Sequence, residues 1–158
     1  MKVIWLISIF CLGLSGAAVS SVRTLERTDG TQLTYYFDAP EVAQFPILIL
    51  LQGSTCRSSF PLYEMVAPTA RSQGIATLVI EKRGLTQDSV QCPQEYLLSN
   101  TFNDRILDHL TVISELRRAE SRWNKKAGWA GGSEGGVIAS LTAHLIPETS
   151  ALLLFSSA

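Results

Sequence analysis

The most constraining feature of this sequence is a series of short, almost continuous apolar runs separated by segments with helical spacing. The runs occupy residues 45–51, 74–80 and 151–155. An apolar run of this length is typical of a strand buried on both faces of a parallel sheet. Because neighbouring parallel strands need a crossover connection, this alternation predicts the α/β class with a mostly parallel sheet.

The segments between these runs give the remaining elements. Asp29-Gly30 lies between two strand-like runs and predicts an N-terminal β-hairpin. Apolar residues at helical spacing predict helices, and a short strand leads into a glycine-rich turn. The expected hairpin strands are 22–26 and 32–37, the helices are 61–73, 101–119 and 137–145, and the further strand is 126–130. We expect an irregular polar loop over 85–99.

The N-terminus has the pattern of a secretory signal peptide. Lys2 precedes an apolar run over 3–14 and a small-residue stretch over 15–20. The alternative is an uncleaved anchor, but the apolar run is shorter than the ~20 residues that a spanning helix needs. We therefore expect a signal peptide over 1–20, a mature domain over 21–158 without a stable membrane span, and a secreted or periplasmic location.

Composition limits the partners of this chain. Its 158 residues are 46% hydrophobic and 17% charged, with a net charge of -1, which suits a single globular domain. No basic stripe is available for phosphate groups, so we do not expect a nucleic-acid partner.

The expected export would place the mature chain in an oxidising compartment, where cysteines can pair. Cys11 would leave with the signal peptide, so the mature chain keeps Cys56 and Cys92, which we expect to form a disulfide. The alternative is two free thiols. Neither His109 nor His144 has zinc-type spacing with a cysteine, and no metal site is predicted.

The motif that carries chemistry is G-x-S-x-G, formed by Gly131, Ser133 and Gly135. It lies between an expected strand and an expected helix, where a tight turn exposes the serine at the helix N-terminus. The letters fit neither a dinucleotide-binding loop nor a P-loop. The remaining alternative is a glycine-rich turn with an incidental serine.

With this motif in place, the segment 21–158 resembles the leading portion of the α/β-hydrolase fold, ending near the sixth strand. The resemblance implies that Ser133 is a nucleophile, and that the backbone N–H groups of Ser54 and Glu134 form an oxyanion hole. Gln52 stands where the family commonly has histidine, and Arg83-Gly84 resembles a structural Arg-Gly pair. The second glycine after the serine, Gly136, is similar to the elbow of prolyl-oligopeptidase-like and related acyl-hydrolase branches.

The resemblance implies an exported serine hydrolase that acts on a small-molecule or peptide acyl substrate without a cofactor. In this family the triad acid and histidine follow the serine along the chain, so we expect both beyond Ala158. His144, eleven residues after Ser133 on one helix, would lie ~16 Å away. We therefore expect a fragment with little activity, completed by a missing C-terminal segment or a second chain. The alternative is a non-catalytic pseudoenzyme or binding fragment that pairs with another chain.

Overall fold

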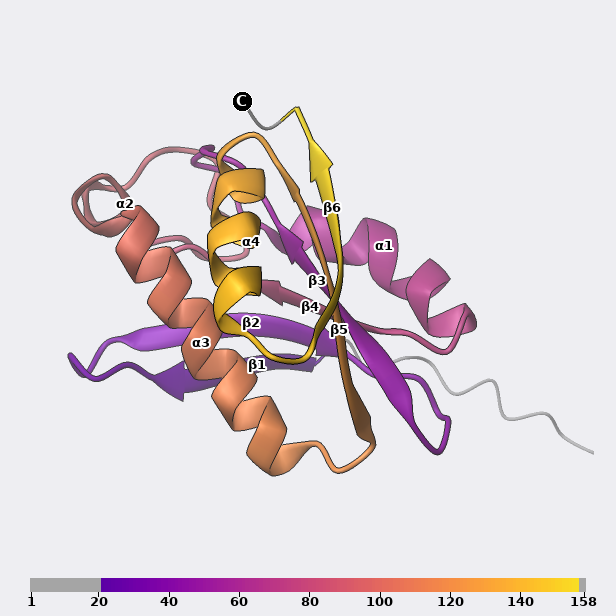
Figure 1. Ribbon diagram of the computed structural model, residues 1–158. Coiled ribbons are helices and arrows are strands. Elements are labelled where there is room, and N and C mark those ends of the chain that lie inside the picture. The colour runs from indigo at the N-terminus through magenta and orange to yellow at the C-terminus, as the bar shows by residue number, and fades with distance from the viewer. Residues whose placement is uncertain (1–20, 157–158) are drawn as a thin grey trace, which may run out of the picture.

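The computed structural model describes residues 21–156. These residues form one sheet with helices on both faces (Figure 1). The strands are β1 (Ser21–Glu26), β2 (Gln32–Asp38), β3 (Phe45–Leu51), β4 (Ala76–Ile80), β5 (Trp123–Gly132) and β6 (Thr149–Phe155). The helices are α1 (Phe60–Ser72), α2 (Gln94–Ser99), α3 (Phe102–Ala119) and α4 (Glu134–Leu145). The six strands lie in the order β1-β2-β4-β3-β5-β6.

The direction of the strands confirms the expected sheet. β1 and β2 form an antiparallel hairpin, and β2 is antiparallel to β4. The pairs β3–β4, β3–β5 and β5–β6 are parallel. Because parallel strands end at the same edge, the residues that follow β3, β4, β5 and β6 meet there.

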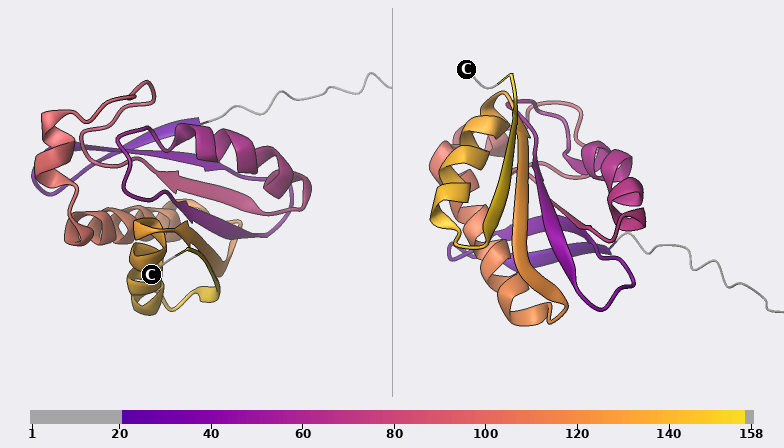
Figure 2. Two further views of the ribbon diagram at one scale, coloured as in Figure 1. Left: turned by 90° about the horizontal axis from the view of Figure 1, so that it is seen from above. Right: turned by 45° about the vertical axis from the view of Figure 1, so that its right-hand side comes forward.

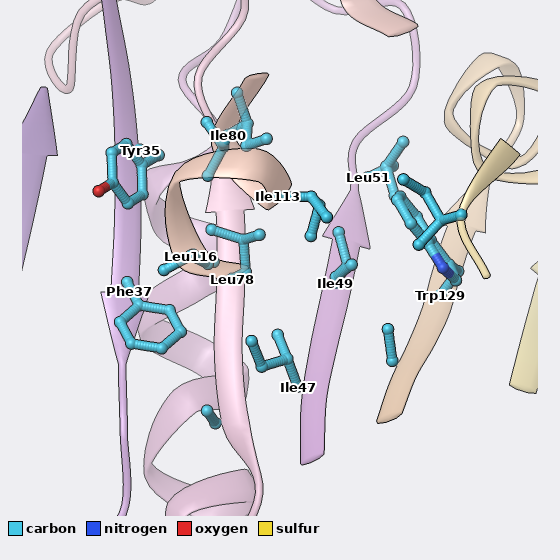
Figure 3. Packing of buried hydrophobic residues seen from close by; sticks show 14 of the residues in the cluster. Tyr35, Phe37, Ile47, Ile49, Leu51, Leu78, Ile80, Ile113, Leu116 and Trp129 are labelled. Carbon is cyan, nitrogen blue, oxygen red and sulfur yellow. The ribbon is translucent and has the colours of Figure 1, made fainter. Parts of the chain in front are cut away.

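Helices cover the two faces of the sheet unequally. Figure 2 shows α3 and α4 on one face and α1 on the other. The larger core lies under α3 and α4, where side chains of β2, β3 and β4 pack against the helices, with Trp129 of β5 beside them (Figure 3). The smaller core lies under α1 and includes Tyr36, Tyr63 and Val79.

Three polar residues of α3 lie in the interior, of which only His109 was expected on or near the apolar stripe. Arg105, Asp108 and His109 are all buried. Asp108 accepts two hydrogen bonds from the buried guanidinium of Arg27, at 2.7 and 2.8 Å, and this ion pair joins α3 to the hairpin. A helical stripe can accept such residues only where a partner satisfies each charge.

Three expectations from the sequence need correction. The segment 85–99 is not wholly irregular, because it contains α2. β5 begins at Trp123 and α4 at Glu134, so both are longer than expected at their N-terminal ends. β6 has the apolar pattern of a strand buried on both faces, but Leu152, Leu153 and Leu154 are 43%, 55% and 44% exposed. It lies at the edge of the sheet among the described residues, with β5 as its neighbour.

The proposed signal peptide, residues 1–20, lies outside the described residues. Within residues 21–156, no helix is long and apolar enough to cross a membrane.

Candidate functional site

Ser133 occupies the sharp turn between β5 and α4. Its φ of 52° and ψ of -131° place a non-glycine residue in a strained region of backbone space. Its N–H donates to the carbonyl of Phe155 at 3.0 Å, and its carbonyl accepts from the N–H of Gly136 at 2.9 Å. The residue is exposed at the N-terminus of α4, where the helix dipole favours negative charge. This is the arrangement that the G-x-S-x-G motif predicts.

The two elbow glycines lie where neighbouring backbone leaves no room for a side chain. A Cβ on Gly131 would come within 3.0 Å of the backbone of Gly135 and Gly136. A Cβ on Gly135 would come within 3.0 Å of the backbone of Leu51 and Gln52. The elbow is therefore packed both on itself and on the end of β3.

The loop after β3 passes directly beside the serine. A Cβ on Gly53 would lie 3.3 Å from Ser133 Cβ and 3.7 Å from Ser133 Oγ. The next residue, Ser54, is exposed. Within residues 21–156, the N–H groups of Ser54 and Glu134 donate no backbone–backbone hydrogen bond. The two N–H groups predicted as an oxyanion hole thus belong to segments that meet at Ser133 and keep free donors.

Two buried residues after β4 anchor this loop, and sequence reasoning missed both. The carboxylate of Glu81 accepts from the N–H of Ser59 at 3.0 Å and from the Ser58 hydroxyl. Lys82 Nζ donates to Gln52 Oε1 at 2.7 Å, to Gly53 O at 3.5 Å and to Thr55 O. The Gln52 side chain is thus a structural partner of the loop.

Burial has an electrostatic cost for Lys82. Burial, together with the nearby positive charge of Arg105, lowers the pKa of this ammonium to about 8. Adjacent Glu81 and Glu134 partly offset that decrease. In the sequence, Glu81 and Lys82 are simply two charges directly after an apolar run. Such a pair is usually a solvated turn, so the sequence does not predict their burial.

Sequence reasoning also missed Arg105, because a charged side chain is usually found away from the apolar stripe of a helix. Its side chain is only 5% exposed. Its guanidinium donates to Glu134 Oε1 at 2.6 Å and to the carbonyl of Gln52 at 2.6 Å. It therefore connects the residue after Ser133 with the loop after β3.

A disulfide joins Cys56 to Cys92, with the two Cα atoms 4.6 Å apart. Cys56 lies in the loop that passes Ser133, and Cys92 lies in the connection between β4 and α2. The N–H of Ser58 also donates to the carbonyl of Ser89 at 3.1 Å. Both links tie the outer part of the β3–α1 loop to the neighbouring loop.

Among residues 21–156, neither histidine forms a hydrogen bond with Ser133. The buried ring of His109 donates from Nδ1 to the carbonyl of Arg105 at 2.6 Å, and its centroid lies 6.1 Å from that of Trp129. Burial lowers its pKa to about 4. His144 is exposed in the last turn of α4. These positions leave Ser133 Oγ without an imidazole base among the described residues.

Solved hydrolases share this fold. Similar structures include a cold-adapted esterase from an Arctic intertidal metagenomic library, with a TM-score of 0.68 and 19% identity over 84% of this chain and 58% of the other. Est1E from Butyrivibrio proteoclasticus gives a TM-score of 0.63 and 23% identity, over 84% of this chain and 49% of the other.

The epoxide hydrolase VrEH1 from Vigna radiata gives a TM-score of 0.62 and 16% identity, over 85% of this chain and 38% of the other. This chain thus spans about 38% to 58% of the length of these three structures. No protein-family model and no curated protein matches the sequence.

Proposed function

We propose that this chain belongs to an exported serine hydrolase that cleaves an ester, thioester or peptide through an acyl-enzyme at Ser133. The observation that carries the proposal is the strained, exposed Ser133 at the start of α4, with the Gly53 loop against it. Strain of this kind persists only where surrounding structure holds it, and it is common at active sites.

In the proposed reaction, Ser133 Oγ attacks the carbonyl carbon of the substrate while its proton passes to a base. The carbonyl oxygen becomes an oxyanion that accepts hydrogen bonds from the N–H groups of Ser54 and Glu134. Collapse of this intermediate breaks the bond to the leaving group, which takes a proton, and leaves the acyl group on Ser133. Water then attacks the acyl-enzyme, and the carboxylic acid departs with Ser133 restored.

The base must come from outside residues 21–156, since His109 is held inside the core and His144 is at the far end of α4. We propose that a further segment or a second chain supplies it with the triad acid. A serine without a base is a weak nucleophile at neutral pH. The described residues alone should therefore turn over substrate slowly.

Export is part of the proposal. It is supported by the disulfide between Cys56 and Cys92, because disulfides persist mainly in oxidising compartments. Export is tested by measuring whether residues 1–20 are cleaved from the chain on secretion. Recovery of a full-length protein from the cytoplasm would oppose it.

The test of catalysis is labelling with a fluorophosphonate probe, with imidazole added as an external base. We expect the label on Ser133, a labelling rate that rises with imidazole concentration, and no such label in Ser133→Ala. Hydrolysis of a short-chain aryl ester should stay slow without imidazole. Fast Ser133-dependent turnover without imidazole would contradict the absence of a base.

A second candidate function, binding without chemistry, is favoured by β6. Leu152, Leu153 and Leu154 are about half-exposed on an edge strand, and such a strand can pair with another polypeptide. Sedimentation velocity of the wild-type chain and Leu153→Lys would test this function. Self-association or complex formation that the substitution leaves unchanged would oppose it.

A further inference from the structure

The guanidinium of Arg105 lies between the two backbone segments that form the proposed oxyanion hole. It donates to the backbone carbonyl of Gln52 and to the side chain of Glu134, each at 2.6 Å. Glu134 supplies one proposed oxyanion donor, and Ser54, two residues after Gln52, supplies the other. We infer that Arg105 is a positioning residue that fixes these two N–H groups relative to each other, an inference that rests on the proposed function.

The direction of the loop's peptide groups follows from these contacts. In a trans peptide the C=O and N–H bonds point in opposite directions, and residues 21–156 contain no cis peptide bond. The Gln52 carbonyl points to Arg105, so the N–H of Gly53 points away from that side chain. The Gly53 carbonyl is 3.5 Å from Lys82 Nζ, so the N–H of Ser54 points away from the ammonium. Arg105 and Lys82 thus hold the carbonyl side of the loop and leave its N–H donors pointing away from these two cations.

The contact with Glu134 fixes the other segment. Glu134 is the first residue of α4, and its side chain is tethered to Arg105 while its N–H has no backbone partner within residues 21–156. A rotation of the elbow would therefore break a charge-assisted hydrogen bond. One side chain of α3 consequently restrains both halves of the proposed hole.

The effect of Arg105 is geometric more than electrostatic. Its positive charge is paired with the carboxylate of Glu134, so the pair adds little net charge near a developing oxyanion. A lysine in its place would keep the charge but lose the planar fork that reaches two acceptors at once. Lysine should therefore restore little function, which separates positioning from simple charge stabilisation.

A matched control is a second buried arginine that pairs with the same helix. Arg27 also forms a buried ion pair with α3, through Asp108, but it contacts neither Gln52 nor Glu134 in the described structure. Arg27→Met should lower stability without disturbing the proposed hole. The comparison distinguishes a local role of Arg105 from a general loss of packing.

The experiment measures imidazole-assisted fluorophosphonate labelling of Ser133 in the wild-type chain, Arg105→Met, Arg105→Lys, Glu134→Gln and Arg27→Met. In both Arg105 variants we expect the limiting rate to fall roughly 10- to 100-fold, with little change in the half-saturating probe concentration. Glu134→Gln keeps an acceptor for Arg105 but loses the charge assistance, so its limiting rate should fall less than in the Arg105 variants. Arg27→Met should label at close to the wild-type rate.

Hydrogen exchange of the peptides that contain Ser54 and Glu134 is measured on the same proteins. Faster exchange in both peptides of the Arg105 variants, but not of Arg27→Met, supports the inference. The inference would be overturned by wild-type labelling rates in the Arg105 variants, or by a decrease in labelling rate equal to that of Arg27→Met. If wild-type Ser133 takes no label at any imidazole concentration, the proposed function fails. In that case hydrogen exchange alone tests whether Arg105 positions the two segments. Unchanged exchange in the Arg105 variants then rejects this role.

Discussion

Gly53 and Ser133 lie so close that a methyl group on Gly53 would be 3.7 Å from the serine hydroxyl oxygen. The same methyl group would be 3.2 Å from the carbonyl of Gly132 and 3.3 Å from Ser133 Cβ. These contacts are tight without being impossible. The absence of a side chain at position 53 therefore keeps open the space that a reacting carbonyl would need.

Gly53→Ala should reduce Ser133 labelling with little loss of stability. The added methyl group narrows the space beside Oγ, and the loop can yield by a few tenths of an ångström. We expect a roughly tenfold lower labelling rate in the presence of imidazole. Urea unfolding provides the control for folding. Unchanged labelling of a normally folded variant would show that this space is not used.

Gly131→Ala should destabilise the fold, and Gly128→Ala on the same strand is its matched control. The methyl group at 131 would meet backbone atoms within 3.0 Å, whereas at 128 its nearest neighbours are side-chain atoms at 3.8 and 3.9 Å. Overpacking against backbone should cost about 3 kcal/mol. Urea midpoints measure both variants. Equal urea midpoints for Gly131→Ala and Gly128→Ala would contradict the tight backbone packing at the elbow.

Reduction of the disulfide should lower stability and loosen the loop beside Ser133. Cys56 and Cys92 are 36 residues apart, and the chain-entropy model gives about 4 kcal/mol for a loop of this size. We expect a lower urea midpoint and faster amide exchange over residues 52–59 when a reductant is present. A Cys56→Ala/Cys92→Ala variant should be insensitive to reductant. A midpoint that reductant leaves unchanged in the wild type would oppose this role.

Acidification should destabilise the protein through His109. Its pKa falls from 6.5 to about 4 because burial disfavours the charged ring. Between these values the unfolded chain binds a proton that the folded chain does not, so stability is complete above pH 6.5 and decreases towards pH 4. The loss at pH 4 is up to about 3 kcal/mol.

Urea unfolding at several pH values measures this loss. His109→Gln, which keeps an amide donor for the Arg105 carbonyl, should lack the His109 part of the pH dependence. His144→Gln, changed at an exposed position of α4, is the matched control and should follow the wild type. Identical pH profiles for wild type and His109→Gln would contradict the burial of a neutral imidazole.

The sequence alone predicted those elements whose residue pattern depends directly on local structure. Phe45–Leu51 was predicted at its observed bounds, and Asp29-Gly30 gave the hairpin, where Gly30 has a φ of 81°. The G-x-S-x-G motif predicted the turn at Ser133 because glycine is needed where backbone segments touch. These features depend on neighbours in the chain or on steric limits of the turn.

The sequence did not reveal the buried charges. Arg105, Glu81 and Lys82 resemble ordinary solvated charges by type and spacing, and their burial depends on partners 22 to 53 residues away in the chain. A pattern of local hydrophobicity contains no information on such pairs. The exposure of β6 has a similar origin, since an apolar run predicts a strand but does not say which elements cover it.

The most direct test of the account is peptide mapping of the chain after fluorophosphonate treatment, with and without imidazole, beside Ser133→Ala. If Ser133 is the nucleophile, it carries the label, imidazole accelerates labelling, and Ser133→Ala is not labelled at this peptide. Labelling at another residue, or no label on Ser133 under any of these conditions, would contradict the central claim that Ser133 is a nucleophile.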